Sequence, residues 1–256
     1  MQVQPGVAGG SAQRKYEELL RSWRRRNRRV FVGLALVCGL IVLASLLLAR
    51  IWPGQSWLLG CFAGGAATFF GVARLSPPGW IENWQLGAWG EEATAKALGP
   101  MEAEGWVVVH DLPTGRGNVD HVVVGPGGVF LLDSKRVGGS VVVEGEVMTV
   151  RRLDDPELVY RHPGSGHLLG LARETHERVL RSTRIRVWVQ PVMVVWAEFP
   201  QRKVQGRCAF VHGEELAEWL RAQPQRVAPA RVPQLVAAVR LSWDLSDQAS
   251  TVTHGG

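Results

Sequence analysis

The sequence predicts a domain of the α/β or α+β class, built around one sheet and preceded by two membrane-spanning helices. Two uncharged apolar runs occupy residues 30–49 and 57–73. From residue 80 onward, one helical pattern, several valine-rich strand patterns and then further helix and strand patterns alternate. The chain has 256 residues, which leaves room for one substantial domain beside the apolar segment.

The excess positive charge is confined to the N-terminus. The net charge is +6, and residues 1–29 account for all of it, with eight basic side chains against Glu17 and Glu18. The bulk charge therefore gives no argument for a basic groove on the folded domain. Residues 21–29, rich in arginine, favour a topology signal. A patch for anionic lipid or nucleic acid is the alternative.

The two apolar runs predict a helical hairpin in the membrane over residues 30–74. The first run has the length that crosses a bilayer, about 20 residues, and the second is near the lower limit. The second contains Gly60-x-x-x-Gly64, a spacing that permits helix association and a homo-oligomer. Because only Arg50 lies in the link, the positive-inside rule predicts that the N-terminus and the folded domain both lie in the cytoplasm. A re-entrant second segment is the alternative.

The remaining elements follow from periodicity and turn residues. A linker at residues 76–79 precedes a helix over 80–101, which Gly99-Pro100 ends. We then expect a strand (105–110), a turn-rich loop (111–118), an extended pair (140–143 and 147–151), a helix (168–180), strands (186–196 and 208–212) and helices (214–221 and 233–241). The predicted divisions are a basic tail (1–29), the hairpin (30–74), the folded domain (80–222) and a C-terminal helix with a disordered tail (223–256).

One predicted β-hairpin carries the most informative residues. Two valine-rich runs flank the turn Gly125-Pro-Gly-Gly128. If Gly125 pairs with Gly128, then Asp120 falls opposite Asp133, and Lys135 projects from the same face as Asp133. Facing like charges destabilise a strand pair, so we expect a cation between the carboxylates. Oxygen ligands of this kind suit Mg²⁺ or Mn²⁺.

These residue types suit metal-assisted hydrolysis of a phosphodiester. Carboxylates hold the cation, and Lys135 orients the attacking water and offsets developing charge. The backbone carbonyl of Ser134 is a candidate third ligand, and Glu91 or Glu92 on the preceding helix is a candidate further acid. The glycines of Gly87-Ala-Trp-Gly90 would let that helix approach the sheet. A salt bridge at two strand ends, without function, is the alternative.

Other chemistries lack support in the sequence. It has no phosphate-binding loop and no nucleophile elbow, and the histidines show no zinc spacing. The three cysteines form neither a metal motif nor a disulfide framework. Strand alternation turns His121 away from Asp120, so we expect it to pack. Three arginines are either phosphate contacts or solvated surface: Arg136, Arg151 and Arg152.

Three joined motifs resemble the nuclease-related domain (NERD) family: Gly87-Ala-Trp-Gly-Glu91-Glu, Val109-His-Asp-Leu112, and the run from Gly117 to Arg136. The resemblance covers about residues 80–200. It implies the fold of the PD-(D/E)XK restriction-endonuclease-like superfamily, with an αβββαβ core and a mixed central sheet.

The same resemblance implies roles for individual residues. Asp120 and Asp133 would bind metal, Lys135 would assist the water, and Glu91 would be the helix-borne acid. The expected function is a membrane-anchored nuclease that depends on a divalent metal and cuts DNA or RNA. The alternatives are a non-catalytic, membrane-tethered binding or assembly module with the same fold, and a regulator that binds lipid surfaces through the arginine-rich tail.

Overall fold

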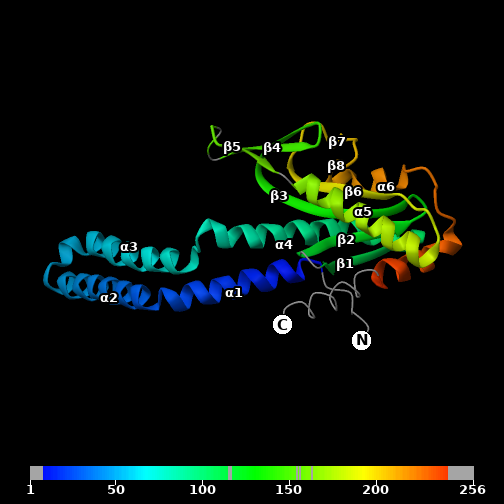
Figure 1. The fold of residues 1–256 in the computed structure, drawn as a ribbon. Helices are drawn as coiled ribbons and strands as arrows, with labels where there is room; N and C mark the ends of the chain where they lie inside the picture. Colours follow the sequence, from blue (N-terminus) through cyan, green and yellow to red (C-terminus); the bar gives the residue numbers. More distant parts are fainter. Residues whose placement is uncertain (1–7, 115–116, 154, 156, 163, 242–256) are drawn as a thin grey trace. The chain divides into compact units, whose positions relative to one another are not determined.

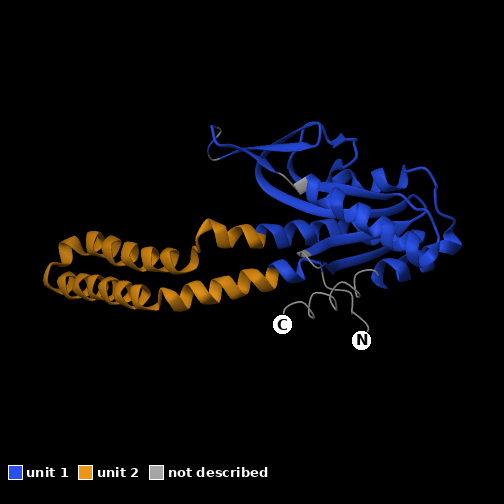
Figure 2. Cartoon of the chain, in the orientation of Figure 1, with its two compact units in different colours: residues 1–12, 86–256 blue, residues 13–85 orange. Residues whose placement is uncertain are grey.

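The computed structural model describes residues 8–114, 117–153, 155, 157–162 and 164–241. The chain divides into two compact units, residues 1–12 with 86–256 and residues 13–85 (Figure 2). The predicted disordered tail from residue 246 lies outside the described residues.

The smaller unit contains the apolar helices. Helix α1 (Gly10–Arg26) is followed by α2 (Arg28–Ile51), the short helix η1 (Pro53–Gln55) and α3 (Ser56–Leu75), and α2 and α3 form an antiparallel pair (Figure 1). Both α2 and the segment Pro53–Leu75 are long and apolar enough to cross a bilayer by length and composition. Only 17% and 6% of their most apolar windows are buried, which is unlike the core helix of a soluble protein.

The larger unit is built on one mixed, eight-stranded sheet (Figure 1). Its main path has the order β1-β2-β3-β6-β8-β7, and β4 pairs with both β3 and β5. Strand β6 runs parallel to β3 and β8, and the other pairs are antiparallel. The strands are β1 (Val107–Thr114), β2 (Gly117–Gly125), β3 (Gly128–Glu144), β4 (Val147–Arg152), β5 (Val159–His162), β6 (Val189–Glu198), β7 (Lys203–Val204) and β8 (Ala209–His212).

Helices cover both faces of this sheet. One apolar cluster receives side chains from α4 (Gly79–Leu98), from η2 (Gly99–Glu104) and from α6 (Leu216–Arg221), which follows η3 (Gly213–Glu215). The other cluster receives them from α5 (Gly164–Thr183) and from the helix of residues 232–241, which follows η4 (Pro229–Arg231). The order α4, β1, β2, β3, α5, β6 is the predicted αβββαβ order, with β4 and β5 inserted before α5. The predicted α/β class and mixed sheet are therefore confirmed.

The predicted hairpin has the predicted register. Gly125 pairs with Gly128 across the turn. A Cβ atom on Gly125 would lie 2.1 Å from the ring of Trp106, so only glycine lets this indole pack against the turn. The pairing fixes which side chains of β2 and β3 share a face.

Several predicted boundaries were wrong. The predicted loop over 111–118 is largely strand, because β1 extends to Thr114 and β2 begins at Gly117. β1 lies at an edge of the sheet, where Pro113 is tolerated. The expected separate strand at 140–143 is the distal half of β3, which continues through an irregularity between Arg136 and Ser140. The short strands β5 and β7 were not predicted.

Candidate active site

Asp120 and Asp133 stand in neighbouring strands, at the end of the ladder between β2 and β3. The last recorded pair is His121 with Leu132, and one further step brings Asp120 opposite Asp133. The backbone amide of Ser134 donates a hydrogen bond of 2.6 Å to Oδ2 of Asp120. A side-chain oxygen thus takes the place of a ladder acceptor and fixes Asp120 against β3.

Lys135 is bonded to the second aspartate. Its Nζ lies 2.6 Å from Oδ1 of Asp133, and the two side chains are 27% and 21% exposed, so solvent reaches the pair. Burial alone would lower the pKa of Lys135, but the charges of Asp133 and Asp120 outweigh burial and raise that pKa. The amine therefore stays protonated beside the acids.

A cavity of about 280 Å³ brings these groups together. Asp120, Asp133 and Lys135 all line it. The remaining lining residues come from the start of β2, from β3, from the end of β5 and from the first turns of α5: Asn118, Val119, Leu132, His162, His167, Leu168 and Leu171. The hairpin register therefore places two predicted ligands and the predicted lysine at one accessible hollow.

Glu91 on α4 is the helix-borne acid that approaches the aspartates. It is buried, whereas Glu92 is exposed. Burial raises the pKa of Glu91 from 4.5 to about 7, and repulsion from Asp111 adds to this rise. The amide of Gly9 donates a hydrogen bond of 3.0 Å to Oε2 of Glu91, which acts in the opposite direction. Glu91 is thus an electrostatic neighbour of the site, although it does not line the cavity described above.

Asp111 is an acid that sequence reasoning assigned to a loop. Its neighbours in β1 pair in register with β2 on both sides, which places Asp111 at the level of Asp120. Its φ is 49°, in the left-handed region that a residue with a Cβ seldom adopts. Asn118 donates a hydrogen bond of 2.7 Å to its Oδ1. Three aspartates therefore occupy one level of three neighbouring strands. The first of them lies in the motif Val109-His-Asp-Leu112, to which sequence reasoning assigned no site role.

A buried hydrogen-bond network ties α4 to the strands beneath the site. The hydroxyl of Thr94 donates to the carbonyl of Gly90 at 3.0 Å, and the same hydroxyl accepts a hydrogen bond of 2.8 Å from the indole of Trp196. The hydroxyl of Ser134 lies 2.8 Å away and can then only be the donor, because Thr94 has a single proton. Ser134 lies between Asp133 and Lys135 in β3, so this network fixes the strand that carries both.

His121 is a packing residue, as its strand position predicts. It is fully buried, and its Nδ1 lies 2.7 Å from Nδ1 of His110. Burial and the neighbouring imidazole lower the pKa of His121 to about 3, so the ring is neutral. It lies on the α4 face of β2, with Val123, rather than on the Asp120 face.

The donor chemistry suits a divalent cation. Burial, then repulsion from Asp133 and Glu91, raises the pKa of Asp120 well above its usual range, and a cation among these oxygens would relieve the repulsion. Within the described ranges, no group of three or more His, Cys, Asp or Glu side chains has the spacing of a metal site. The described site therefore consists of two facing carboxylates, Asp120 and Asp133, while the carboxylate of Glu91 accepts a hydrogen bond from the amide of Gly9.

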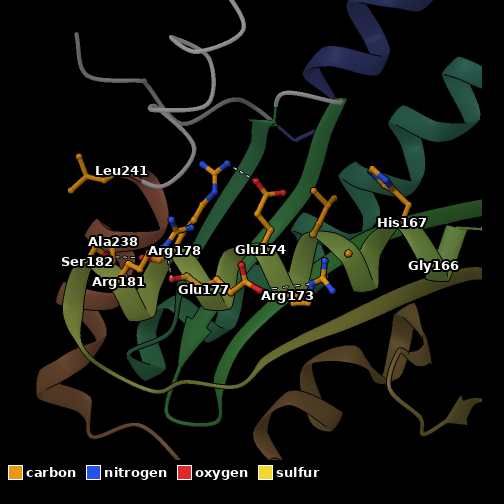
Figure 3. Close-up of a pocket in the computed structure, with 12 residues that line it drawn as sticks. Gly166, His167, Arg173, Glu174, Glu177, Arg178, Arg181, Ser182, Ala238 and Leu241 are labelled. Carbon is orange, nitrogen blue, oxygen red and sulfur yellow. Dashed lines mark hydrogen bonds and ion pairs between the residues drawn. The ribbon is translucent and has the colours of Figure 1, made fainter.

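A larger cavity, of about 890 Å³, lies away from this chemistry. It runs between α5 and the helix of residues 232–241 (Figure 3). Its charged side chains pair with one another, Arg173 with Glu177 and Arg178 with Glu174. None of the predicted site residues lines it.

Comparison with known proteins identifies one family. The model of the nuclease-related domain matches residues 86–196, a range that begins in α4 and ends in β6 and includes Glu91, Asp120, Asp133 and Lys135. No curated protein and no solved structure matches the chain. The resemblance noted from the motifs is confirmed, with slightly narrower limits than the expected 80–200. Residues 86–196 of this chain therefore constitute a nuclease-related domain.

Proposed function

We propose that this protein is a membrane-anchored nuclease that depends on a divalent metal, Mg²⁺ or Mn²⁺, and hydrolyses phosphodiester bonds of DNA or RNA. The observation that supports it best is the shared cavity, where two facing aspartates and a lysine from a nuclease-related domain meet solvent. Asp120, Asp133 and the carbonyl of Ser134 would hold the cation, and Glu91 would add a fourth oxygen donor. When bound, a cation of this kind polarises a phosphate and lowers the pKa of a bound water.

Lys135 has the remaining chemical task. Its protonated amine, held by Asp133, can hydrogen-bond the attacking water and offset the negative charge that develops on the phosphate. Because Asp133 fixes the amine at 2.6 Å, no reorganisation of the lysine is needed as charge develops. The aspartate pair and the lysine thus supply binding and orientation from two neighbouring strands, β2 and β3.

The substrate path is set by the β4–β5 extension of the sheet. His162 lines the cavity, and it lies opposite Met148, while Tyr160 lies opposite Val150. Both partners are buried core residues, so His162 and Tyr160 share the core-side face of β5. Tyr160 is nevertheless 39% exposed. A single strand of nucleic acid that leaves the cavity along β5 would meet the ring of Tyr160, on which a base can stack.

Arginines on opposite faces of this extension allow a matched test. Arg152, opposite Leu158, shares the face of Tyr160, whereas Arg161, opposite Thr149, points from the other face. We expect Arg152→Ala to weaken single-strand binding and to reduce the salt slope by about 0.7, the value for one phosphate contact. Arg161→Ala, with the same lost charge, serves as the control. Equal losses of nucleic-acid binding by the two variants would mean that the arginines act only through unspecific charge attraction and would contradict the proposed path.

The decisive experiment uses the full chain in detergent with Mg²⁺ or Mn²⁺ and single-stranded, duplex and RNA substrates. Lys135→Ala and Asp133→Asn should each reduce cleavage about 100-fold or more, while Lys203→Ala on β7 should not. EDTA should abolish cleavage. Inactivity of the wild-type chain on all three substrates would favour the non-catalytic binding or assembly module instead.

The membrane anchor and its orientation complete the proposal. The exposed apolar surfaces of α2 and α3 suit contact with lipid, and the arginines before α2 favour a cytoplasmic N-terminus. Two crossings return the chain to the cytoplasm, so the nuclease-related domain would face cytoplasmic nucleic acid. The packing of small residues in α3 would permit, but does not require, association of two copies.

A further inference from the structure

The residue directly before α1 contacts the helix-borne acid. Helix α1 has no acidic residue in its first turn, so its first backbone amides lack a local anionic partner. Glu91, 82 positions later in the chain, supplies one, because its Oε2 accepts a buried hydrogen bond of 3.0 Å from the amide of Gly9. The start of α1 is thus capped by a side chain of α4.

The contact requires glycine at position 9. Its φ is +73°, which L side chains rarely adopt, and a Cβ there would lie 2.9 Å from the carbonyl oxygen of Ala88. Ala88 is fully buried and Ala12 is 6% exposed, so the segment of residues 8–12 is packed. Residues up to Ala12 belong to the same compact unit as the nuclease-related domain. The hydrogen bond is therefore part of a packed arrangement.

The hydrogen bond uses one oxygen of the carboxylate. With Oε2 held, the rotation of the Glu91 side chain is restricted. Groups that hydrogen-bond a ligating carboxylate orient it, and their loss typically weakens metal affinity about 10–100-fold. Nothing in the sequence near Gly9 marks it as part of a site whose first residue, Glu91, lies 82 positions later.

We propose that the Gly9 amide is a positioning group of the metal site, because it holds by Oε2 the Glu91 carboxylate that would be one of the cation's oxygen donors. The inference rests on the proposed function, because it needs Glu91 to be a metal ligand. It makes the N-terminal segment before the first apolar helix a component of the nuclease site. It also predicts that substitutions at position 9 act on metal binding through Glu91 alone.

The test measures Mn²⁺ binding to the full chain in detergent, by titration calorimetry, with no nucleic acid present. Gly9→Pro removes the amide proton, and Gly9→Ala retains the proton but disfavours the docked conformation. We expect both to weaken Mn²⁺ binding about 10-fold. Ser11→Ala, in the same segment, is the control and should bind Mn²⁺ as the wild type does. Thermal unfolding of each variant reports whether the fold is retained.

A double-mutant cycle separates positioning from a structural effect. In the Glu91→Ala background, Gly9→Pro should cause no further loss of Mn²⁺ affinity, because the carboxylate through which it acts is gone. A loss that persists there overturns the proposal, as does tighter Mn²⁺ binding by Gly9→Pro, which would mean that the segment withholds Glu91. A wild-type chain that binds no Mn²⁺ refutes the metal site and this inference together. Equal binding by wild type and Gly9→Pro refutes only this inference.

Discussion

Replacing Thr94 by valine tests the hydrogen-bond network beneath the site, because the change removes one hydroxyl and nearly preserves the volume. In the native chain this hydroxyl contacts the Gly90 carbonyl, the Ser134 hydroxyl and the Trp196 indole at 3.0, 2.8 and 2.8 Å. Thr94 is fully buried, and Ser134 is 5% exposed. The variant therefore leaves a buried hydroxyl and a partly buried indole N–H without their partner.

The magnitude follows from what those two groups lose. A buried polar group deprived of its partner costs about 1–3 kcal/mol, and the indole, which is only partly buried, falls at the lower end. We expect Thr94→Val to lower the free energy of unfolding by about 2–4 kcal/mol. At this chain length each kcal/mol shifts the Tm by about 2–4 °C, so the Tm should fall by roughly 5–15 °C.

Thr175 offers a matched control. It is also a fully buried helical threonine, but its hydroxyl only donates to the carbonyl of Leu171, one turn earlier, at 2.8 Å. That bond resembles the one from Thr94 to Gly90, so its loss cancels in the comparison. We expect Thr175→Val to cost less than about 1 kcal/mol. Thermal unfolding of the full chain in detergent, followed by near-ultraviolet circular dichroism, measures both. Equal losses of Tm would show that the contacts to Ser134 and Trp196 contribute nothing.

Three further predictions concern charge, thiol reactivity and topology. Burial and Asp111 raise the pKa of Glu91 from 4.5 to about 7, so the metal-free chain loses stability as the pH rises through that window. Glu91→Gln should therefore stabilise it by on the order of 3 kcal/mol near pH 8 and by nothing near pH 4, measured by thermal unfolding in EDTA; the same gain at both pH values would contradict this. Burial raises the pKa of Cys208 to about 12, so iodoacetamide should modify it, as seen by peptide mass spectrometry, only after denaturant is added. A membrane-impermeant maleimide should label Gln55→Cys on intact cells and Gln205→Cys only after permeabilisation, and the reverse pattern would invert the orientation.

The hairpin register could be predicted because its determinants are local. Four consecutive turn residues between two valine runs allow few alternatives, and a slip by one residue would turn the apolar side chains of β2 to the other face. Once Gly125 pairs with Gly128, the facing positions of Asp120 and Asp133 follow by counting. The predicted pair and the lysine beside it were therefore accessible from the sequence alone.

The contacts of Glu91 could not be predicted in this way, because they depend on packing between distant segments. The sequence offers two adjacent glutamates, and only the burial of one helix face separates Glu91 from Glu92. The close approach of α4 to β3 at Gly90, where a Cβ would lie 3.1 Å from Cβ of Arg136, was foreseen from the glycine. The hydrogen bond from Gly9 has no local signal of any kind.

Asp111 was missed because β1 is extended by its partner rather than by its own propensity. The run Asp111-Leu-Pro-Thr114 favours a turn, yet pairing with β2 on both sides of Asp111 keeps this segment in the sheet. Its left-handed φ lets Leu112 enter the core cluster that contains Val109, three positions earlier in β1, which strict alternation would forbid. Tertiary burial here outweighs a local backbone cost of about 1–2 kcal/mol.

The charge that results bears directly on how a nucleic acid could enter. Glu91, Asp111, Asp120 and Asp133 bring four carboxylates into mutual electrostatic range, with the ammonium group of Lys135 among them. When all five side chains are ionised, they carry three net negative charges. Burial, and then this repulsion, raises the pKa values of Glu91 and Asp120. A phosphodiester is itself an anion and would be repelled by such a cluster. A function on phosphodiesters would therefore require added positive charge at these carboxylates, which a bound divalent cation would supply.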